Sequence, residues 1–158
     1  MSNTKVAIIS GGASGIGLAV AQALYADGWQ VYVLYRSQTR ADEAAKSLPL
    51  ARFIQTDVTS WDSLAKAFAQ VFLETCRVDF VFANAGVMPC EDFFSLDAGG
   101  PLVMSPIDVN LKGVMETCHL ALRYFRFSPH GGRGAVVIVD ASCAGLVSHE
   151  PAGPISHN

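Results

Sequence analysis

Short apolar runs alternate with longer amphipathic stretches along most of the chain. The runs rich in β-branched and aromatic residues predict strands, because such side chains suit a pleated, buried surface. The stretches in which apolar residues recur every three or four positions predict helices. We predict strands at residues 5–10, 30–35, 52–56, 78–83 and 134–140, and helices at residues 15–27, 39–48, 60–76 and 105–127.

The regular alternation of strands and helices predicts an α/β fold. Parallel strands need crossover connections, which are usually right-handed helices, so the sheet should carry helices on both faces. The last helix is expected to begin with Ser105 as its cap, Pro106 in its first turn and Asp108 completing a capping box. With 158 residues, the chain is expected to form a single domain over residues 1–158.

The composition narrows the class of protein. Apolar residues make up 51% of the chain and charged residues 16%, which favours a packed core over a disordered chain. The formal net charge of −3 argues against a nucleic-acid partner. The apolar runs are too short to cross a bilayer, and we expect no signal peptide before the first strand. The four cysteines lack zinc-ligand spacing, so we expect a cytoplasmic protein with reduced thiols, no metal and no membrane contact.

A glycine-rich loop joins the first predicted strand to the first predicted helix. Glycine lacks a Cβ atom, so the backbone can turn sharply and approach a pyrophosphate, toward which the helix directs its first N–H groups. In this strand–loop–helix setting the pattern predicts a dinucleotide-binding site. The residues expected to hold the pyrophosphate are Gly11, Ser14, Gly15, Ile16 and Gly17.

Five motifs, in order along the chain, resemble those of the short-chain dehydrogenase/reductase family in its smaller type. The motifs are residues 10–17 for the family's TGxxxGIG, Asp57-Val58, residues 83–86 for its NNAG, Asn110 and Ser142. Two positions depart from the family pattern, with Ser10 for Thr and Ala83 for the first Asn. The resemblance implies a Rossmann-like, doubly wound nucleotide-binding domain. We expect about five strands in the order 3-2-1-4-5, with the C-terminal part of the family fold missing.

The charge at the end of the second predicted strand favours one cofactor over another. The resemblance implies that Asp57 meets the adenine amino group and that Asn84 lies beside the ribose. An acidic residue after the second strand would bind the ribose 2′-hydroxyl of NAD. This chain has Arg36 instead, whose planar guanidinium suits a 2′-phosphate. NADP(H) is therefore the expected cofactor.

The family's active site consists of Asn, Ser, Tyr and Lys, and this chain is similar to it at the first two positions. The resemblance gives Asn110 a supporting role and implies that Ser142 orients an oxygen of a small-molecule substrate. Ser156 stands where the Tyr is expected, and the Lys position would fall beyond Asn158. Because the family's Tyr moves the proton and the Lys lowers the pKa of that Tyr, we expect an oxidoreductase by descent with impaired or altered redox chemistry.

Two other classes of function stay open. His149 follows Ser142 and titrates near working pH, so a cofactor-independent isomerase or cyclase could use the same pocket, although a plain exposed histidine is the simpler interpretation. A non-catalytic binding protein is the other alternative. Truncation would uncover apolar residues of the helix at 105–127 and leave the strand at 134–140 as an open edge. We therefore expect a homodimer, or pairing with another chain, through these two elements.

Overall fold

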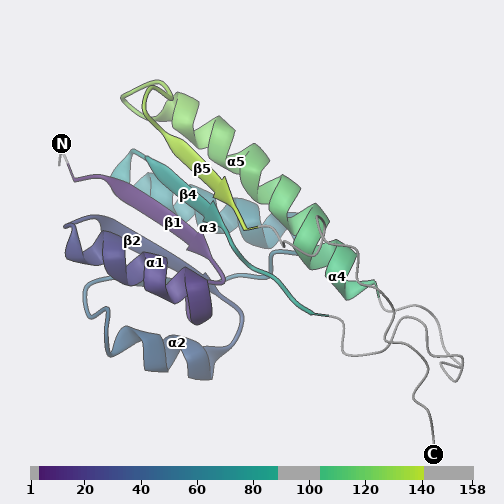
Figure 1. The fold of residues 1–158 in the computed structure, drawn as a ribbon. Coiled ribbons are helices and arrows are strands. Elements are labelled where there is room, and N and C mark those ends of the chain that lie inside the picture. The colour runs from purple at the N-terminus through teal and green to yellow at the C-terminus, as the bar shows by residue number, and fades with distance from the viewer. Residues whose placement is uncertain (1–3, 89–103, 141–158) are drawn as a thin grey trace, which may run out of the picture.

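The computed structural model describes residues 4–88 and 104–140. Within these residues, five strands form one parallel sheet in the order β3-β2-β1-β4-β5, which confirms the predicted topology (Figure 1). The strands are β1 (Val6–Ser10), β2 (Gln30–Tyr35), β3 (Arg52–Gln55), β4 (Phe80–Ala83) and β5 (Val136–Val139).

Helices cover both faces of the sheet. One face carries α1 (Gly15–Ala26) and α2 (Gln38–Ala45) (Figure 1). The other carries α3 (Trp61–Thr75) and α5 (Val114–Phe127). A short helix α4 (Ser105–Ile107) and a π-helical segment η1 (Asp108–Gly113) lead into α5. The expected doubly wound arrangement is confirmed.

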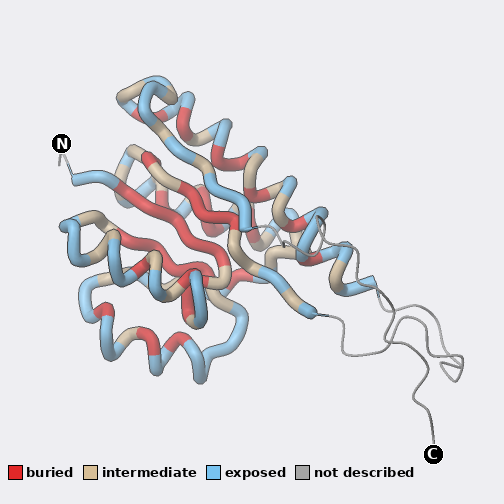
Figure 2. The backbone as a smooth tube through the Cα atoms, in the orientation of Figure 1, coloured by how far each residue is buried: buried red, intermediate tan, exposed pale blue. Residues whose placement is uncertain are grey.

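Alternate side chains of the central strands enter two separate cores. Successive residues of a strand point to opposite faces, so a strand covered by helices on both sides must be apolar throughout. All five residues of β1 are buried, and Figure 2 shows the same for most of β2 and β4. One core packs Ile8, Tyr32 and Leu34 with α3 and α5, and the other packs Ile9, Val31 and Val33 with residues of α1 and α2.

The predicted helix at 105–127 is interrupted, and the predicted cap is wrong. Helix α4 begins at Ser105 itself, the residue before it is Met104, and no side chain caps the start. The interruption falls at η1, where two tertiary contacts fix the backbone. A Cβ atom at Gly113 would lie 2.9 Å from the Val58 carbonyl oxygen. The Asn110 side chain is hydrogen-bonded to Val87 in the loop that follows β4. The segment η1 is therefore packed closely against the loops that follow β3 and β4.

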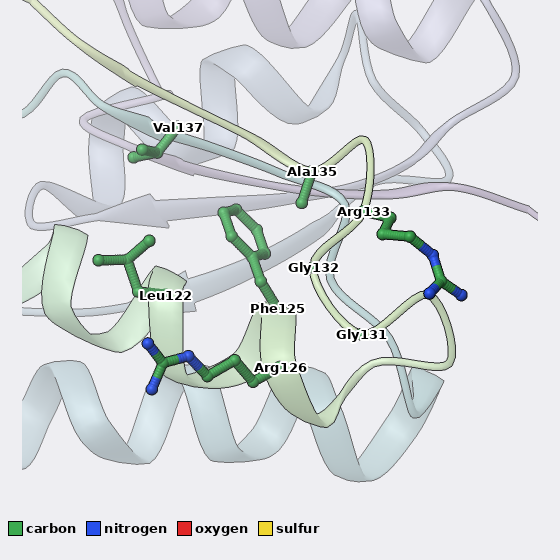
Figure 3. A pocket seen from close by; sticks show the side chains of 8 residues that line it. All are labelled: Leu122, Phe125, Arg126, Gly131, Gly132, Arg133, Ala135 and Val137. Atoms are coloured by element: carbon green, nitrogen blue, oxygen red, sulfur yellow. The ribbon is translucent and has the colours of Figure 1, made fainter.

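β5 lies at one edge of the described sheet, and its residues are less covered than those of the central strands. Val136, Ile138 and Val139 are each 44–46% exposed. A cavity of about 400 Å³ opens between α5 and the chain that enters β5. Figure 3 shows its lining side chains, with Leu122, Phe125 and Arg126 from α5, Arg133 and Ala135 from the residues leading into β5, and Val137 from β5 itself.

Candidate functional site

A cavity of about 590 Å³ lies beyond the carboxyl ends of β1, β2, β3 and β4. This is where open α/β sheets bind ligands, because the loops that follow parallel strands converge at one edge. Four strand-end loops contribute to its wall. The residues are Gly11, Ala13, Ser14, Tyr35, Arg36, Ser37, Arg40, Thr56, Asp57, Val58, residues 84–88 and Val109.

The glycine loop lies against the loop that follows β4. Gly11 has φ of +65°, and a Cβ atom there would lie 2.9 Å from Ala85 Cα. A side chain at this position would therefore displace backbone. Gly15 also has positive φ, at +55°, but a Cβ atom there would meet nothing within 4 Å. Gly11 is required by close packing, whereas Gly15 is required by its backbone conformation alone.

The start of α1 is held close to β4 by a third glycine. A Cβ atom at Gly17 would lie 2.5 Å from Asn84 Nδ2 and 2.7 Å from the Gly11 carbonyl oxygen. Gly15, Ile16 and Gly17 do not line the cavity, and Ile16 is 62% exposed. Ser14 precedes α1 in an extended conformation and makes no side-chain cap. The first N–H groups of α1 are thus left for a ligand at this end of the helix.

Ser10 and Asn84 bind the strand-end loops to one another. The buried Ser10 hydroxyl donates to the Phe82 carbonyl oxygen at 3.3 Å and accepts from the N–H groups of Asn84 and Ala85 at 3.0 and 3.1 Å. The Asn84 side-chain amide donates to the carbonyl oxygens of Ser10 and Gly11 at 3.0 and 3.3 Å. Asn84 does line the cavity, as expected for a residue beside a ribose, but its amide nitrogen is used to hold the glycine loop.

Arg36 and Asp57 face the cavity from the ends of β2 and β3. The Asp57 carboxylate accepts two hydrogen bonds from Thr59, one from its N–H at 2.9 Å and one from its hydroxyl at 2.8 Å. These bonds hold the pKa of Asp57 below its ordinary value, and the positive charge of Arg36 contributes in the same direction. Asp57 is therefore a fixed carboxylate at the position expected for adenine contact.

A second arginine, which the sequence reasoning did not single out, also lines this cavity. Arg40 lies in the first turn of α2, and its Nη1 atom donates to the Ser14 hydroxyl at 3.3 Å. The contact joins residues 26 positions apart. The available signal was a second arginine four positions after Arg36, in the first turn of the helix predicted to follow β2.

Asn110 lies on η1 and binds the loop that follows β4. Its Oδ1 accepts from the Val87 N–H and its Nδ2 donates to the Val87 carbonyl oxygen, both at 2.8 Å. This pair satisfies both backbone groups of Val87, so Asn110 positions the chain beside the cavity. The other two residues proposed for catalysis, Ser142 and His149, lie outside the described residues.

A family model described as short chain dehydrogenase matches residues 5–153. The chain belongs to the short-chain dehydrogenase family. Short-chain dehydrogenase/reductase prx7 of Penicillium rubens is 42% identical over 141 residues, a match that covers 83% of this chain and 50% of prx7. The NADP-dependent dehydrogenase clz5 of Cochliobolus lunatus is 38% identical over 131 residues, which are 77% of this chain and 46% of clz5.

A solved member of the short-chain dehydrogenase family has the same fold. The crystal structure of a short-chain type dehydrogenase/reductase from Mycobacterium marinum matches with a TM-score of 0.79 at 28% identity, covering 93% of this chain and 59% of that chain. The chain spans about half the length of the curated relatives it matches. The family membership and Rossmann-like fold expected from the sequence motifs are thereby confirmed.

Residues 4–88 and 104–140 lack two features that mark other classes of protein. In these ranges no helix is long and apolar enough to cross a membrane. The same residues contain no group of three or more His, Cys, Asp or Glu side chains that could hold a metal ion. Cys76 and Cys118 are present as free thiols.

Proposed function

We propose that this chain forms the cofactor-binding part of an oxidoreductase that uses NADP(H). One observation carries the proposal: a single cavity brings together the glycine loop, the arginine-bearing end of β2 and the Asp57 loop. The pyrophosphate would lie against the glycine loop and the first N–H groups of α1, where a Cβ atom at Gly11 would meet backbone. The name of the relative clz5, an NADP-dependent dehydrogenase, supports the same cofactor.

The protein's own contribution to the chemistry is to bind and orient. NADPH supplies a hydride when it is bound, and the chain holds the cofactor by its phosphates and adenosine. Asn110 fixes the backbone at Val87 beside the cavity, and Ser142 would orient a substrate oxygen. Because Ser156 occupies the position of the family's Tyr, we propose that these 158 residues alone reduce carbonyl compounds slowly or not at all.

Titration of NADPH into the purified chain, followed by nicotinamide fluorescence, tests the proposal. We expect a Kd on the order of micromolar for NADPH and binding at least about tenfold weaker for NADH. A folded chain that binds neither nucleotide would overturn the proposal. Equal affinity for NADPH and NADH would overturn the preference for NADP(H), but it would still support nucleotide binding at the glycine loop.

Two variants at Gly15 make the titration specific for the glycine loop. Gly15→Asp and Gly15→Ala both place a side chain at a φ of +55° with nothing within 4 Å of the new Cβ atom, and aspartate tolerates this backbone conformation better than alanine does. Only the aspartate brings a negative charge to the phosphates. Gly15→Asp should abolish binding, whereas Gly15→Ala should retain most of it, with circular dichroism confirming that both variants fold.

We also propose that another protein surface covers α5 and β5. Leu111, Met115 and Leu122 recur at helical spacing and are 55–64% exposed. Helix α5 lies on the same side of the sheet as α3 (Figure 1), and Leu122 lines the cavity beside β5. A second copy of the chain is the partner proposed for this surface.

A further inference from the structure

Arg40 gives the cofactor cavity a second guanidinium group. It extends from the first turn of α2 to the Ser14 hydroxyl, at 3.3 Å, and both residues line the cavity together with Arg36. The contact joins the start of α2 to the glycine loop. Asp57, the residue expected to meet adenine, lines the same cavity.

The positive charge of Arg40 is not neutralised by an ion pair within the described residues. The two acidic side chains of α2 have other partners: Asp42 accepts from Gln38 at 2.7 Å, and Glu43 pairs with Lys46 at 2.7 Å. The carboxylate in the cavity wall, Asp57, is bound by Thr59. With two arginines and one carboxylate, the cavity wall retains an excess positive charge.

The start of α2 adds neutral donors beside these arginines. Ser37 precedes the helix, lines the cavity and makes no side-chain cap. The first turn of α2 contains no acidic residue. Its first N–H groups have no partner inside the helix and carry the positive end of the helix dipole, so they favour a phosphate. The helix start and the two guanidinium groups therefore point to the same kind of ligand.

We infer that Arg40, together with Arg36 and Ser37, binds the 2′-phosphate of the adenosine ribose, and that the Ser14 hydroxyl holds Arg40 in position before the nucleotide arrives. The inference rests on the proposed function and extends it by naming a second residue that determines cofactor specificity. Guanidinium groups bind phosphate oxygens through paired hydrogen bonds, and two of them can bind different oxygens of one phosphate. Both arginines are exposed, so the preference should weaken as salt rises.

Calorimetric titration with two adenosine fragments tests the inference without any enzyme activity. Adenosine 2′,5′-bisphosphate and adenosine 5′-monophosphate differ only in the 2′-phosphate. Wild-type chain should bind the bisphosphate at least about tenfold more tightly. Arg40→Ala should weaken binding of the bisphosphate about tenfold and leave the affinity for the monophosphate within about twofold of the wild-type value. Arg40→Lys should recover part of the loss, because it restores the charge but not the paired hydrogen bonds.

Arg133→Ala is the matched control, because Arg133 is an exposed arginine in the chain that leads into β5. It should leave both affinities unchanged. If Arg40→Ala weakens the binding of both fragments equally, Arg40 only stabilises the glycine loop and the inference fails. It fails also if Arg40→Ala changes neither affinity while Arg36→Ala removes the preference. A wild-type chain that binds neither fragment and no NADPH would overturn the proposed function itself.

Discussion

Ser10 and Asn84 show how single side chains prepare the cavity. Each uses its polar atoms on backbone groups of neighbouring strand ends, so the glycine loop is fixed without a ligand. The family's fingerprint has a threonine where this chain has Ser10, and both residues carry the hydroxyl that makes these bonds. The glycine loop can therefore keep its shape before binding, which lowers the entropic cost of ordering it around a nucleotide.

Replacing Ser10 with alanine should leave the Asn84 and Ala85 N–H groups without the hydroxyl that they now bind. We expect Ser10→Ala to lower the free energy of unfolding by about 1–3 kcal/mol, the usual cost of an unsatisfied buried polar group. Ser10→Thr keeps the hydroxyl and should cost less. Urea denaturation measures both variants, and equal stability of Ser10→Ala and wild type would contradict this role for the hydroxyl.

Asp57 should make the stability of the fold depend on pH in the acid range. Its pKa is lower in the folded chain than its ordinary value of 3.8, because Thr59 donates two hydrogen bonds to the carboxylate. The stabilisation is thus fully present above pH 3.8 and is lost as pH falls through the folded pKa.

Urea denaturation of wild type and Asp57→Asn at several pH values checks this dependence. The difference in unfolding free energy should be constant near neutral pH and should shrink in acid. Thr59→Val removes one of the two donors, so it should raise the pKa of Asp57 toward its ordinary value and reduce the acid sensitivity. A difference that grows as pH falls would contradict the assignment.

The positions of the strands and helices were largely predictable, because they follow from the local pattern of apolar and polar residues. Strand bounds agree with the hydrophobic pattern to within two residues. The observed β4 begins two residues later than predicted, and Asp79, just before it, uses its carboxylate to accept from the Val6 N–H at 2.8 Å. By contrast, η1 and the Arg40–Ser14 contact depend on residues 23 and 26 positions away, which no local pattern records. The roles expected for Ser142 and His149 stay predictions.

Asn110→Ala should separate η1 from the loop that follows β4. The variant loses both hydrogen bonds to Val87, and we expect a loss of about 1–2 kcal/mol in unfolding free energy. Hydrogen exchange of the Val87 amide should become much faster than in wild type. Lys112→Ala, on the same segment but bonded to Thr59 at 3.3 Å, is the control and should leave the Val87 exchange rate unchanged. Unchanged exchange in Asn110→Ala would contradict the positioning role.

At the scale of the whole molecule, the carboxyl ends of the strands differ from the β5 edge of the sheet. The cofactor cavity is bordered by four loops with fixed hydrogen bonds, whereas the β5 edge and the adjoining face of α5 expose apolar side chains. Backbone groups at a sheet edge readily pair with another strand, and an apolar helix face gains free energy when it is covered. This difference supports the proposals of a nucleotide in the cavity and of a second copy of the chain on the β5 and α5 surface.

Charge placed on the α5 face should disrupt self-association. We expect wild-type chain to sediment as a dimer at micromolar concentrations and the double variant Met115→Glu, Leu122→Glu to sediment as a monomer, because two carboxylates would have to be desolvated at the interface. Leu50→Glu is the control, since Leu50 is 80% exposed on the connection before β3. A monomeric wild-type chain would contradict the proposed homodimer.

Mapping of backbone amide chemical shifts during an NADPH titration tests the central claim most directly, because it reports where the nucleotide binds. The largest changes should fall on the glycine loop at 10–17, on residues 36–40 and on Asp57-Val58. The cavity lined by Leu122 and Val137 should be unaffected. Changes concentrated at that second cavity, or none at the glycine loop in a folded chain, would contradict the account.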